Sequence, residues 1–353
     1  MKKFPRSAAV RPVRRPMLRG LIRSVAATAV TAAFGLSGLL SPVVAQAADK
    51  VVFQLDWLPG GDKSPIYVAM KEGFFAAEGL EVSLSSGRGS SDAIGKLASG
   101  ASDVGVAGIS ALMTAVAEGK APVKVVMSLY TKQPDALFTV KGSGIQSLKD
   151  VVGKTVATST FTSSNALWPV VLQRNGVDPS QVKLLKVDAS TLAPMLAQGK
   201  VDATINWITV GPGFQSVLSQ AGKELAILPW SAYGLDGYGW SVMASDKMIK
   251  DRPDVLRRVL VALKKGFDFA LADPDKAAAA LKAQVPEMDA KSAAAEFRAS
   301  IALLDNEVTK KDGRGAFEPK LLSATWQWVA TSMNYPIDKI DPEKLVDRSF
   351  LPK

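Results

Sequence analysis

Apolar and polar positions along residues 50–132 predict short strands separated by helices. The apolar run "KVVFQLDW" (residues 50–57) predicts a strand, and apolar residues at helical spacing follow it up to Gly79. The segment "LEVSLSS" (residues 80–86) alternates apolar with polar positions and predicts the next strand. A helix and a strand then follow twice more. This order is typical of a parallel sheet with helices on its faces, which is an α/β architecture.

The rhythm changes at residues 133–135, where a strand leads away from the first group of elements. A second series of strands and helices follows, and "GYGWSVMAS" (residues 237–245) predicts a strand that could return to the first sheet. From Arg252 onward the pattern is helical and amphipathic. We therefore expect a cleaved signal peptide at 1–47, the first part of lobe 1 at 48–140, lobe 2 at 141–237, and the return strand of lobe 1 with the C-terminal helices at 238–353.

Two segments of the chain share one plan. "GKLASGASDVGVAG" (residues 95–108) and "PMLAQGKVDATINW" (residues 194–207) each run from a helix end through a glycine turn and an aspartate into a strand. The similarity indicates that the lobes are weak internal duplicates. A chance match is the alternative, since helix–Gly–strand turns are common.

The net charge of +10 is misleading as a signal for nucleic acid, because it is concentrated at one end. Residues 1–47 carry eight basic residues and no acidic ones, and without them 35 basic residues face 33 acidic ones. We therefore expect no nucleic-acid partner.

The basic N-terminal segment is typical of an export signal. The apolar run at residues 25–40 is shorter than the roughly 20 residues of a membrane-spanning helix, and Ala45 and Ala47 form an A-x-A pattern. We expect cleavage after Ala47 and a periplasmic protein; an uncleaved anchor is the alternative. The Sec route is favoured, although the pair Arg14-Arg15 leaves the twin-arginine route open and a start at Met17 would remove that pair.

The chain contains no cysteine and no histidine. It therefore has no lipid-bearing cysteine, no disulfide, and no Ser-His-Asp or Cys-His catalytic set. The commonest metal ligand is missing as well, and no helix carries metal-ligand spacing. We expect no metal, no cofactor and no enzyme activity.

Candidate ligand contacts lie where predicted strands end. An open α/β sheet binds ligands beyond the carboxyl ends of its strands, and helix starts there present free backbone N–H groups. Hydroxyls, amides and tryptophans gather at these ends, in Asp56-Trp57 and in the loops at residues 87–92, 107–111, 158–165 and 206–213.

Each of these features has a structural alternative. A Ser, Thr or Asp at a helix start is usually a cap, and tryptophan in an α/β protein is most often part of the core. Arg88 either pairs with an anion or reaches solvent, and Asp56 either meets a ligand or forms a salt bridge that anchors its loop. The coincidence of several such features at one edge of two sheets favours the ligand interpretation.

The chain resembles a family of transport proteins. "LDWLP", "YVAMKEGFFAAEGLEV", "GSSDAIGKLASGASDVGVAG", "SLKDVVGKTVATS" and "LAQGKVDATINW" resemble, in this order, the ABC-transporter substrate-binding proteins for thiamine pyrimidine precursors, nitrate, aliphatic sulfonates and taurine. The resemblance implies a two-lobe periplasmic-binding-protein fold of type 2. Each lobe would hold a mainly parallel sheet flanked by helices, and a ligand would be captured between the lobes by hinge closure.

The resemblance and the strand-end pattern together suggest a solute-binding protein that delivers a small organic ligand to an ABC permease and its ATPase subunits as a monomer. The ligand would be a pyrimidine or other nitrogen heterocycle, or a sulfonate. A flexible loop at Gly60-Gly61 would let the lip of lobe 1 fit it closely. The expected ligand contacts are Asp56, Trp57, Tyr67, Arg88, Ser90, Ser91, Ser110, Phe161, Thr162, Ser163, Asn206, Trp207 and Trp240.

Two rival functions remain. One is a related enzyme of pyrimidine-precursor synthesis, although the family's enzymes depend on a metal and on His or Cys. The other is a ligand-sensing module for a membrane receptor.

Overall fold

A computed structural model describes residues 47–119 and 121–352 of the chain, and Ala47–Lys353 forms one compact unit. Apart from Ala47, the expected signal peptide lies outside the described residues. In the described part, no helix is both long and apolar enough to cross a membrane.

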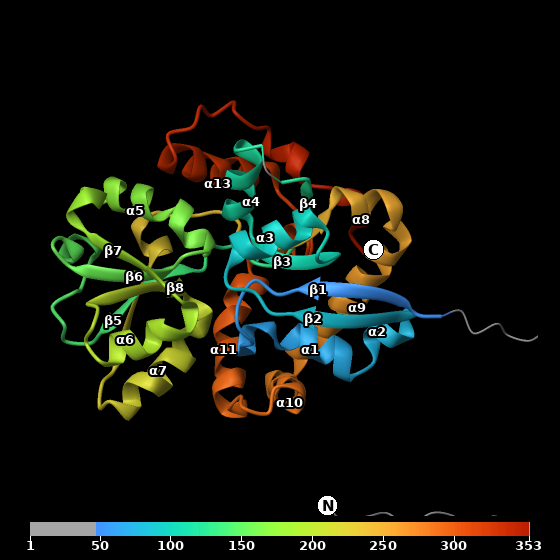
Figure 1. Cartoon of the computed structure of the whole chain (residues 1–353), viewed down its shortest axis with the longest axis horizontal. Helices are drawn as coiled ribbons and strands as arrows, with labels where there is room; N and C mark the ends of the chain where they lie inside the picture. Colours follow the sequence, from blue (N-terminus) through green and yellow to red (C-terminus); the bar gives the residue numbers. More distant parts are fainter. Residues whose placement is uncertain (1–46, 120, 353) are drawn as a thin grey trace, which may run out of the picture. The chain divides into compact units, whose positions relative to one another are not determined.

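Within the described residues, ten strands form two separate sheets of five (Figure 1). The first sheet contains β1 (Asp49–Gln54), β2 (Leu80–Ser85), β3 (Val104–Gly108), β4 (Val123–Ser128) and β10 (Trp240–Ser245). The second contains β5 (Asp135–Val140), β6 (Thr155–Ser159), β7 (Lys183–Val187), β8 (Ala203–Trp207) and β9 (Leu225–Pro229). Their orders are β2-β1-β3-β10-β4 and β7-β6-β8-β5-β9. In each sheet one strand, β10 or β5, runs antiparallel to its neighbours and the others are parallel. The expected mainly parallel α/β architecture is confirmed.

Helices cover both sheets and continue after β10. The first lobe contains α1 (Ser64–Lys71), α2 (Phe74–Ala77), α3 (Ser90–Ser99) and α4 (Ile109–Ala117), and the second contains α5 (Trp168–Arg174), α6 (Leu192–Ala197) and α7 (Gly211–Gln220). After β10 come α8 (Asp246–Asp251), α9 (Pro253–Ala272), α10 (Pro274–Gln284), α11 (Ala290–Leu304), α12 (Glu307–Asp312) and α13 (Pro319–Ser332).

The repeated sequence plan occupies equivalent places in the two sheets. Residues 95–108 end in β3 and residues 194–207 end in β8, and both are the third strand in their sheet's order. Asp103 Oδ2 accepts a hydrogen bond from Val52 N at 2.8 Å, and Asp202 Oδ2 accepts one from Thr155 N at 2.8 Å. Each aspartate thus satisfies the backbone of the neighbouring strand, which gives the repeat a structural cause.

The helical pattern that the sequence shows up to Gly79 forms two helices, α1 and α2. Gly73 has a φ of +73°, a left-handed conformation that glycine adopts without a steric cost. The turn at Gly73 separates the two helices.

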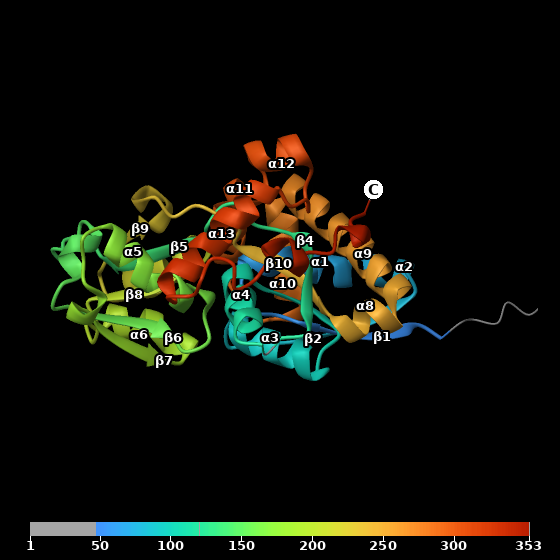
Figure 2. The same cartoon turned by 90° about the horizontal axis from the view of Figure 1, so that it is seen from above.

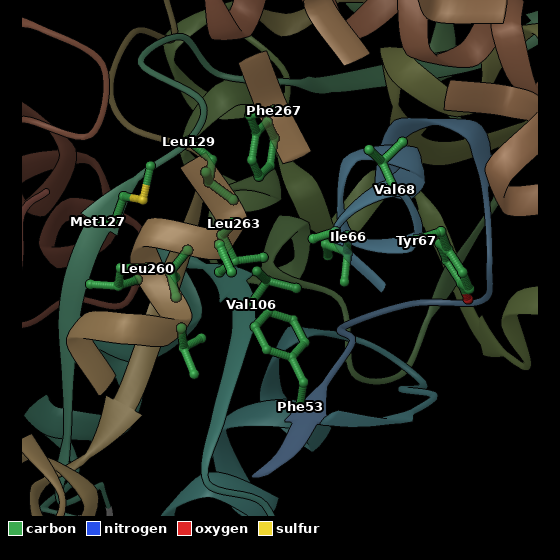
Figure 3. Packing of buried hydrophobic residues seen from close by; sticks show 14 of the residues in the cluster. Phe53, Ile66, Tyr67, Val68, Val106, Met127, Leu129, Leu260, Leu263 and Phe267 are labelled. Carbon is green, nitrogen blue, oxygen red and sulfur yellow. The ribbon is translucent and has the colours of Figure 1, made fainter. Parts of the chain in front are cut away.

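The core of the first lobe packs α1 and α9 against the sheet (Figure 3). Phe53 and Val106 extend from the strands toward Ile66, Leu260 and Leu263, and all five side chains are buried. Full burial of such a side chain contributes about 1.5–3 kcal/mol. This packing fixes the position of α1 and of the loop that precedes it.

Several elements connect the lobes. The two chain segments that join the sheets lie together, since Gly239 N donates to Tyr130 O at 2.9 Å and Gln133 Nε2 donates to Tyr238 O at 3.0 Å. In addition, α13 packs on α4 and α5 (Figure 2), and α11 packs on α7 and on the 3-10 helix η1 (Gly61–Lys63) (Figure 1).

Candidate functional site

A small pocket lies where the carboxyl ends of β1 and β8 face each other. Its walls come from lobe 1 (Asp56, Trp57, Asp62, Lys63 and Ser90) and from lobe 2 (Thr162, Ile205, Asn206, Trp207 and Val210). The free volume is about 30 Å³, which is room for one or two water molecules. An organic ligand needs more room than this, which a separation of the two walls would supply.

The structure brings six of the expected contact residues to this pocket. They are Asp56, Trp57, Ser90, Thr162, Asn206 and Trp207. The Ser90 hydroxyl already accepts a hydrogen bond from Gly108 N at 2.9 Å, and Thr162 caps the 3-10 helix that follows it. Thr162 therefore also fulfils the capping role that the sequence left open, whereas Ser90 is the first residue of α3 and does not cap it.

Five other expected residues lie at contacts between the lobes and do not line the pocket. Ser91 N donates to Phe161 O at 2.9 Å, and Ser110 Oγ lies 3.5 Å from Ser163 O. Arg88 forms an ion pair with Asp92 at 3.1 Å, and its guanidinium lies 4.9 Å from the centre of the Phe161 ring. Arg88 and Phe161 line a second hollow of about 140 Å³.

Tyr67 and Trp240 belong to the core of lobe 1. Trp240 is fully buried, and its ring centre lies 5.3 Å from Lys63 Nζ. The Tyr67 side chain is 4% exposed, and its pKa is raised by burial. Both residues stand behind the pocket wall.

The sequence interpretation missed an ionic group at the centre of the pocket. Lys63 is only 1% exposed, and its Nζ lies 3.0 Å from Asp62 Oδ2 and 3.8 Å from Asp56 Oδ1. Burial opposes the charge on the amine, but the two carboxylates outweigh burial and raise the Lys63 pKa. The lysine therefore stays protonated. Ile205 and Val210, also missed, supply apolar wall.

The loop that carries this ionic group is held tightly, which corrects the expected flexible Gly60-Gly61 lip. A Cβ on Gly61 would lie 1.9 Å from the carbonyl oxygen of Ala293 on α11. Thr209 Oγ1, from lobe 2, donates to Asp62 Oδ2 at 3.2 Å. Glycine is required at position 61 for close approach to α11.

Burial disfavours the charged form of the Asp56 carboxyl group in this pocket. Desolvation raises its pKa to about 6, and Asp62 also raises it, while Lys63 opposes the shift. The indole nitrogen of Trp240 lies near this carboxyl but outside hydrogen-bonding geometry. The salt bridge expected as an alternative is present, yet Asp56 still lines the pocket.

Two buried acceptor atoms, one from each lobe, have no hydrogen bond, although one of them lies 3.8 Å from Lys63 Nζ. Asp56 Oδ1 and Asn206 Oδ1 have no hydrogen-bond partner among the described residues, although both belong to pocket-lining side chains. The Asn206 amide nitrogen is occupied, since it donates to Thr204 Oγ1 at 2.8 Å. An unpaired buried acceptor costs about 1–3 kcal/mol, so a molecule that donates to these atoms recovers that cost.

A second buried carboxyl supports the lobe 2 wall. Asp135 accepts a hydrogen bond from Ser164 Oγ at 2.5 Å, and burial raises its pKa to about 6. The Trp207 indole nitrogen lies near this carboxyl, and the Trp207 ring meets Tyr130 edge-on at 5.9 Å between centres. These contacts fix the orientation of the Trp207 ring.

Within the residues that the structure describes, no group of three or more acidic residues is arranged to hold a metal ion.

Comparisons with known proteins agree with this architecture. A family model described as NMT1/THI5 like matches residues 61–277. The 4-amino-5-hydroxymethyl-2-methylpyrimidine phosphate synthase THI13 of Saccharomyces cerevisiae is 26% identical over 244 residues, which are 65% of this chain and 70% of that protein. The riboflavin-binding protein RibY of Chloroflexus aurantiacus is 24% identical over 323 residues, 89% of this chain and 90% of that protein.

A solved structure shows the same fold. The alkanesulfonate-binding protein SsuA from Xanthomonas axonopodis pv. citri, bound to MOPS, superposes with a TM-score of 0.66 at 16% identity, over 86% of this chain and 99% of that one. The expected periplasmic-binding-protein fold is confirmed. Because the family model spans more than half of the sequence, the chain belongs to the NMT1/THI5-like family.

Proposed function

We propose that this protein is the solute-binding component of an ABC import system and captures a small organic ligand between its lobes. The observation that carries the proposal is a pair of buried acceptors without a hydrogen bond among the described residues, Asp56 Oδ1 and Asn206 Oδ1, one from each lobe, on side chains that line one pocket. A ligand that donates to both gains contacts with both lobes at once. Closure around it then excludes water and strengthens each polar contact.

The charge of the pocket favours a nitrogen heterocycle over a sulfonate. The charged lining residues are Asp56, Asp62 and Lys63, and no arginine is among the lining residues. The lysine is already paired with carboxylates, so an anion would meet surplus negative charge without a free cation. Trp57 and Trp207 add flat apolar surfaces for a ring. The names of two relatives contain nitrogen heterocycles: one is named as a synthase of a pyrimidine phosphate and the other as a riboflavin-binding protein.

The relative named as a synthase makes an enzyme the main alternative. A catalytic lysine needs a lowered pKa to act as a nucleophile, whereas the pKa of Lys63 is raised by Asp62 and Asp56. The chain also offers no histidine or cysteine as a base or nucleophile. These facts support binding without chemical conversion.

The cellular setting follows from the same proposal. The N-terminal signal would export the protein to the periplasm by the Sec route, where a monomer would deliver its ligand to a permease and its ATPase subunits. Deletion of a permease gene beside this one would abolish uptake of the ligand if the protein serves transport, and would leave uptake unchanged if it serves a receptor.

A thermal-shift screen tests the ligand class. The purified protein would be heated with 4-amino-5-hydroxymethyl-2-methylpyrimidine, riboflavin, ethanesulfonate, taurine or nitrate. A ligand at 100 times its Kd stabilises the folded protein by about 2.7 kcal/mol, so a true ligand raises Tm by several degrees. We expect a shift with a heterocycle and none with sulfonates. A shift only with anions, or conversion of the heterocycle to product, would overturn the proposal.

Two variants would locate the binding site of any ligand found. Asp56→Ala should weaken binding about 10- to 100-fold in calorimetry, because it removes a charged acceptor. Ser91→Ala is the control, since Ser91 is exposed and does not line the pocket. Equal affinity of the Asp56→Ala protein and the wild type would exclude this pocket.

A further inference from the structure

Glu296 is a buried carboxylate outside the pocket that contacts elements of both lobes. It lies on α11, is 6% exposed, and does not line the pocket. Its Oε2 accepts a hydrogen bond from Gly61 N at 2.6 Å, and the two residues are 235 positions apart in the sequence. Gly61 begins η1, the turn that carries Asp62 and Lys63 into the pocket.

The other oxygen of Glu296 meets lobe 2. Gly213 is the third residue of α7, where backbone N–H groups have no partner within the helix. The Gly213 N–H interacts with the Glu296 carboxylate, and a Cβ at that position would lie 2.5 Å from Glu296 Oε1. A carboxylate is favoured there, because the N-terminus of a helix carries partial positive charge. The Glu296 carboxylate therefore lies against the N-terminal turn of α7 from its place on α11.

The two contacts connect the pocket walls from behind. Residues 207–210 lead directly into α7 and include the wall residues Trp207 and Val210. Asp62, next to Gly61, accepts from Thr209 in the same lobe 2 segment. One side chain thus ties the loop of the ionic group to the loop of the lobe 2 tryptophan.

We propose that Glu296 is a positioning residue that holds the two lobes in the ligand-binding geometry. The proposal rests on the function proposed above only in taking this cleft as the ligand site. Burial of a carboxylate is costly unless it is hydrogen-bonded. An apolar side chain would fill the same space without that cost, so the carboxylate of Glu296 indicates a role for its polar contacts. The charged groups around Glu296 are Asp62 and Lys63 on η1, whereas the first turn of α7 contains no acidic residue.

The distance between the lobes tests the proposal without any ligand. The chain has no cysteine, so spin labels can be attached specifically at Ser99→Cys on α3 and Ser216→Cys on α7, both at exposed positions. In pulsed electron paramagnetic resonance, we expect a wild-type population at the separation seen in the structure. Glu296→Ala should move molecules from this population to one with a longer separation, so that the ratio of the longer to the shorter population rises about tenfold. Glu296→Gln, which keeps one acceptor, should fall between the two.

Two controls separate positioning from simple stability. Glu287→Gln changes an exposed carboxyl just before α11 and should leave the distances unchanged. Gly213→Ala should lengthen the separation in the wild-type background and have less effect beside Glu296→Ala, which removes the clashing oxygen. Unchanged distances in Glu296→Ala, with or without a lower Tm, would overturn the proposal, as would a wild-type protein that lacks the closed separation. A failed ligand screen would leave this result intact.

Discussion

Lys63 determines the charge balance of the pocket. Two carboxylates, those of Asp56 and Asp62, lie within 3.8 Å of its amine, and all three side chains are buried. A buried ion pair adds little to stability compared with apolar residues, but removal of one partner leaves a charge without compensation. The lysine is therefore needed to keep the acidic walls folded.

Replacement of this lysine should be severe. We predict that Lys63→Ala lowers the free energy of unfolding by about 3–5 kcal/mol, because Asp62 and Asp56 lose the cation that they share. Urea denaturation followed by tryptophan fluorescence measures the change. Lys71→Ala, at the exposed end of α1, is the control and should stay within about 0.5 kcal/mol of wild type. A loss in Lys63→Ala as small as in the control would show that the ion pairs are not needed.

The pocket residues that the sequence identified correctly share one property: the local pattern of apolar and polar residues is enough to place them near a strand end. Asp56 and Asn206 end strands, and the carboxyl ends of strands meet at one edge of a sheet, so their approach was predictable. Asp62 and Lys63 also follow a strand end, but the glycines before them were read as a flexible loop. A charged pair directly before a helix with Pro at its second position was the available signal. Glu296 could not be found, because the glycine whose backbone it binds, Gly61, lies 235 residues away in the chain.

Helix α9 shows how one element fixes the position of another that carries the site. A Cβ on Gly266 would lie 2.3 Å from the carbonyl oxygen of Pro65 on α1. The missing side chain lets the two helices approach closely. Since α1 continues directly from η1, any displacement of α1 also displaces the ionic group in the pocket.

A pair of glycine variants tests this close approach. Gly266→Ala should destabilise the protein by about 1–3 kcal/mol, because the new methyl group forces the helices apart. Gly95→Ala on α3 is the matched control, since a Cβ there would meet no atom within 4 Å. That change should stabilise the protein by roughly 0.5–1 kcal/mol through the higher helix propensity of alanine. Effects of the same sign in both variants, measured by urea denaturation, would contradict this account of α9.

Among the residues that the structure describes, burial raises the pKa values of three carboxyl groups: Asp56 to about 6, Asp135 to about 6 and Glu296 to about 7. Their ordinary values are 3.8, 3.8 and 4.5. Between those limits the folded protein binds more protons than the unfolded chain. Stability therefore falls as pH rises through this window, and it is regained as pH falls toward about 5.

We predict that the free energy of unfolding, measured by urea denaturation, rises as pH is lowered from 8 to 5, by on the order of 1 kcal/mol per pH unit for each group that titrates. The carboxyl groups with lowered pKa values, such as Asp49 and Asp150, lose their stabilising effect only at lower pH and do not reverse the trend. Glu296→Gln should flatten the profile most between pH 6 and 8, because the Glu296 pKa is the highest of the three. Glu287→Gln should reproduce the wild-type profile. If wild type and Glu296→Gln show parallel profiles, Glu296 takes up no proton on folding and does not contribute to the pH dependence of stability.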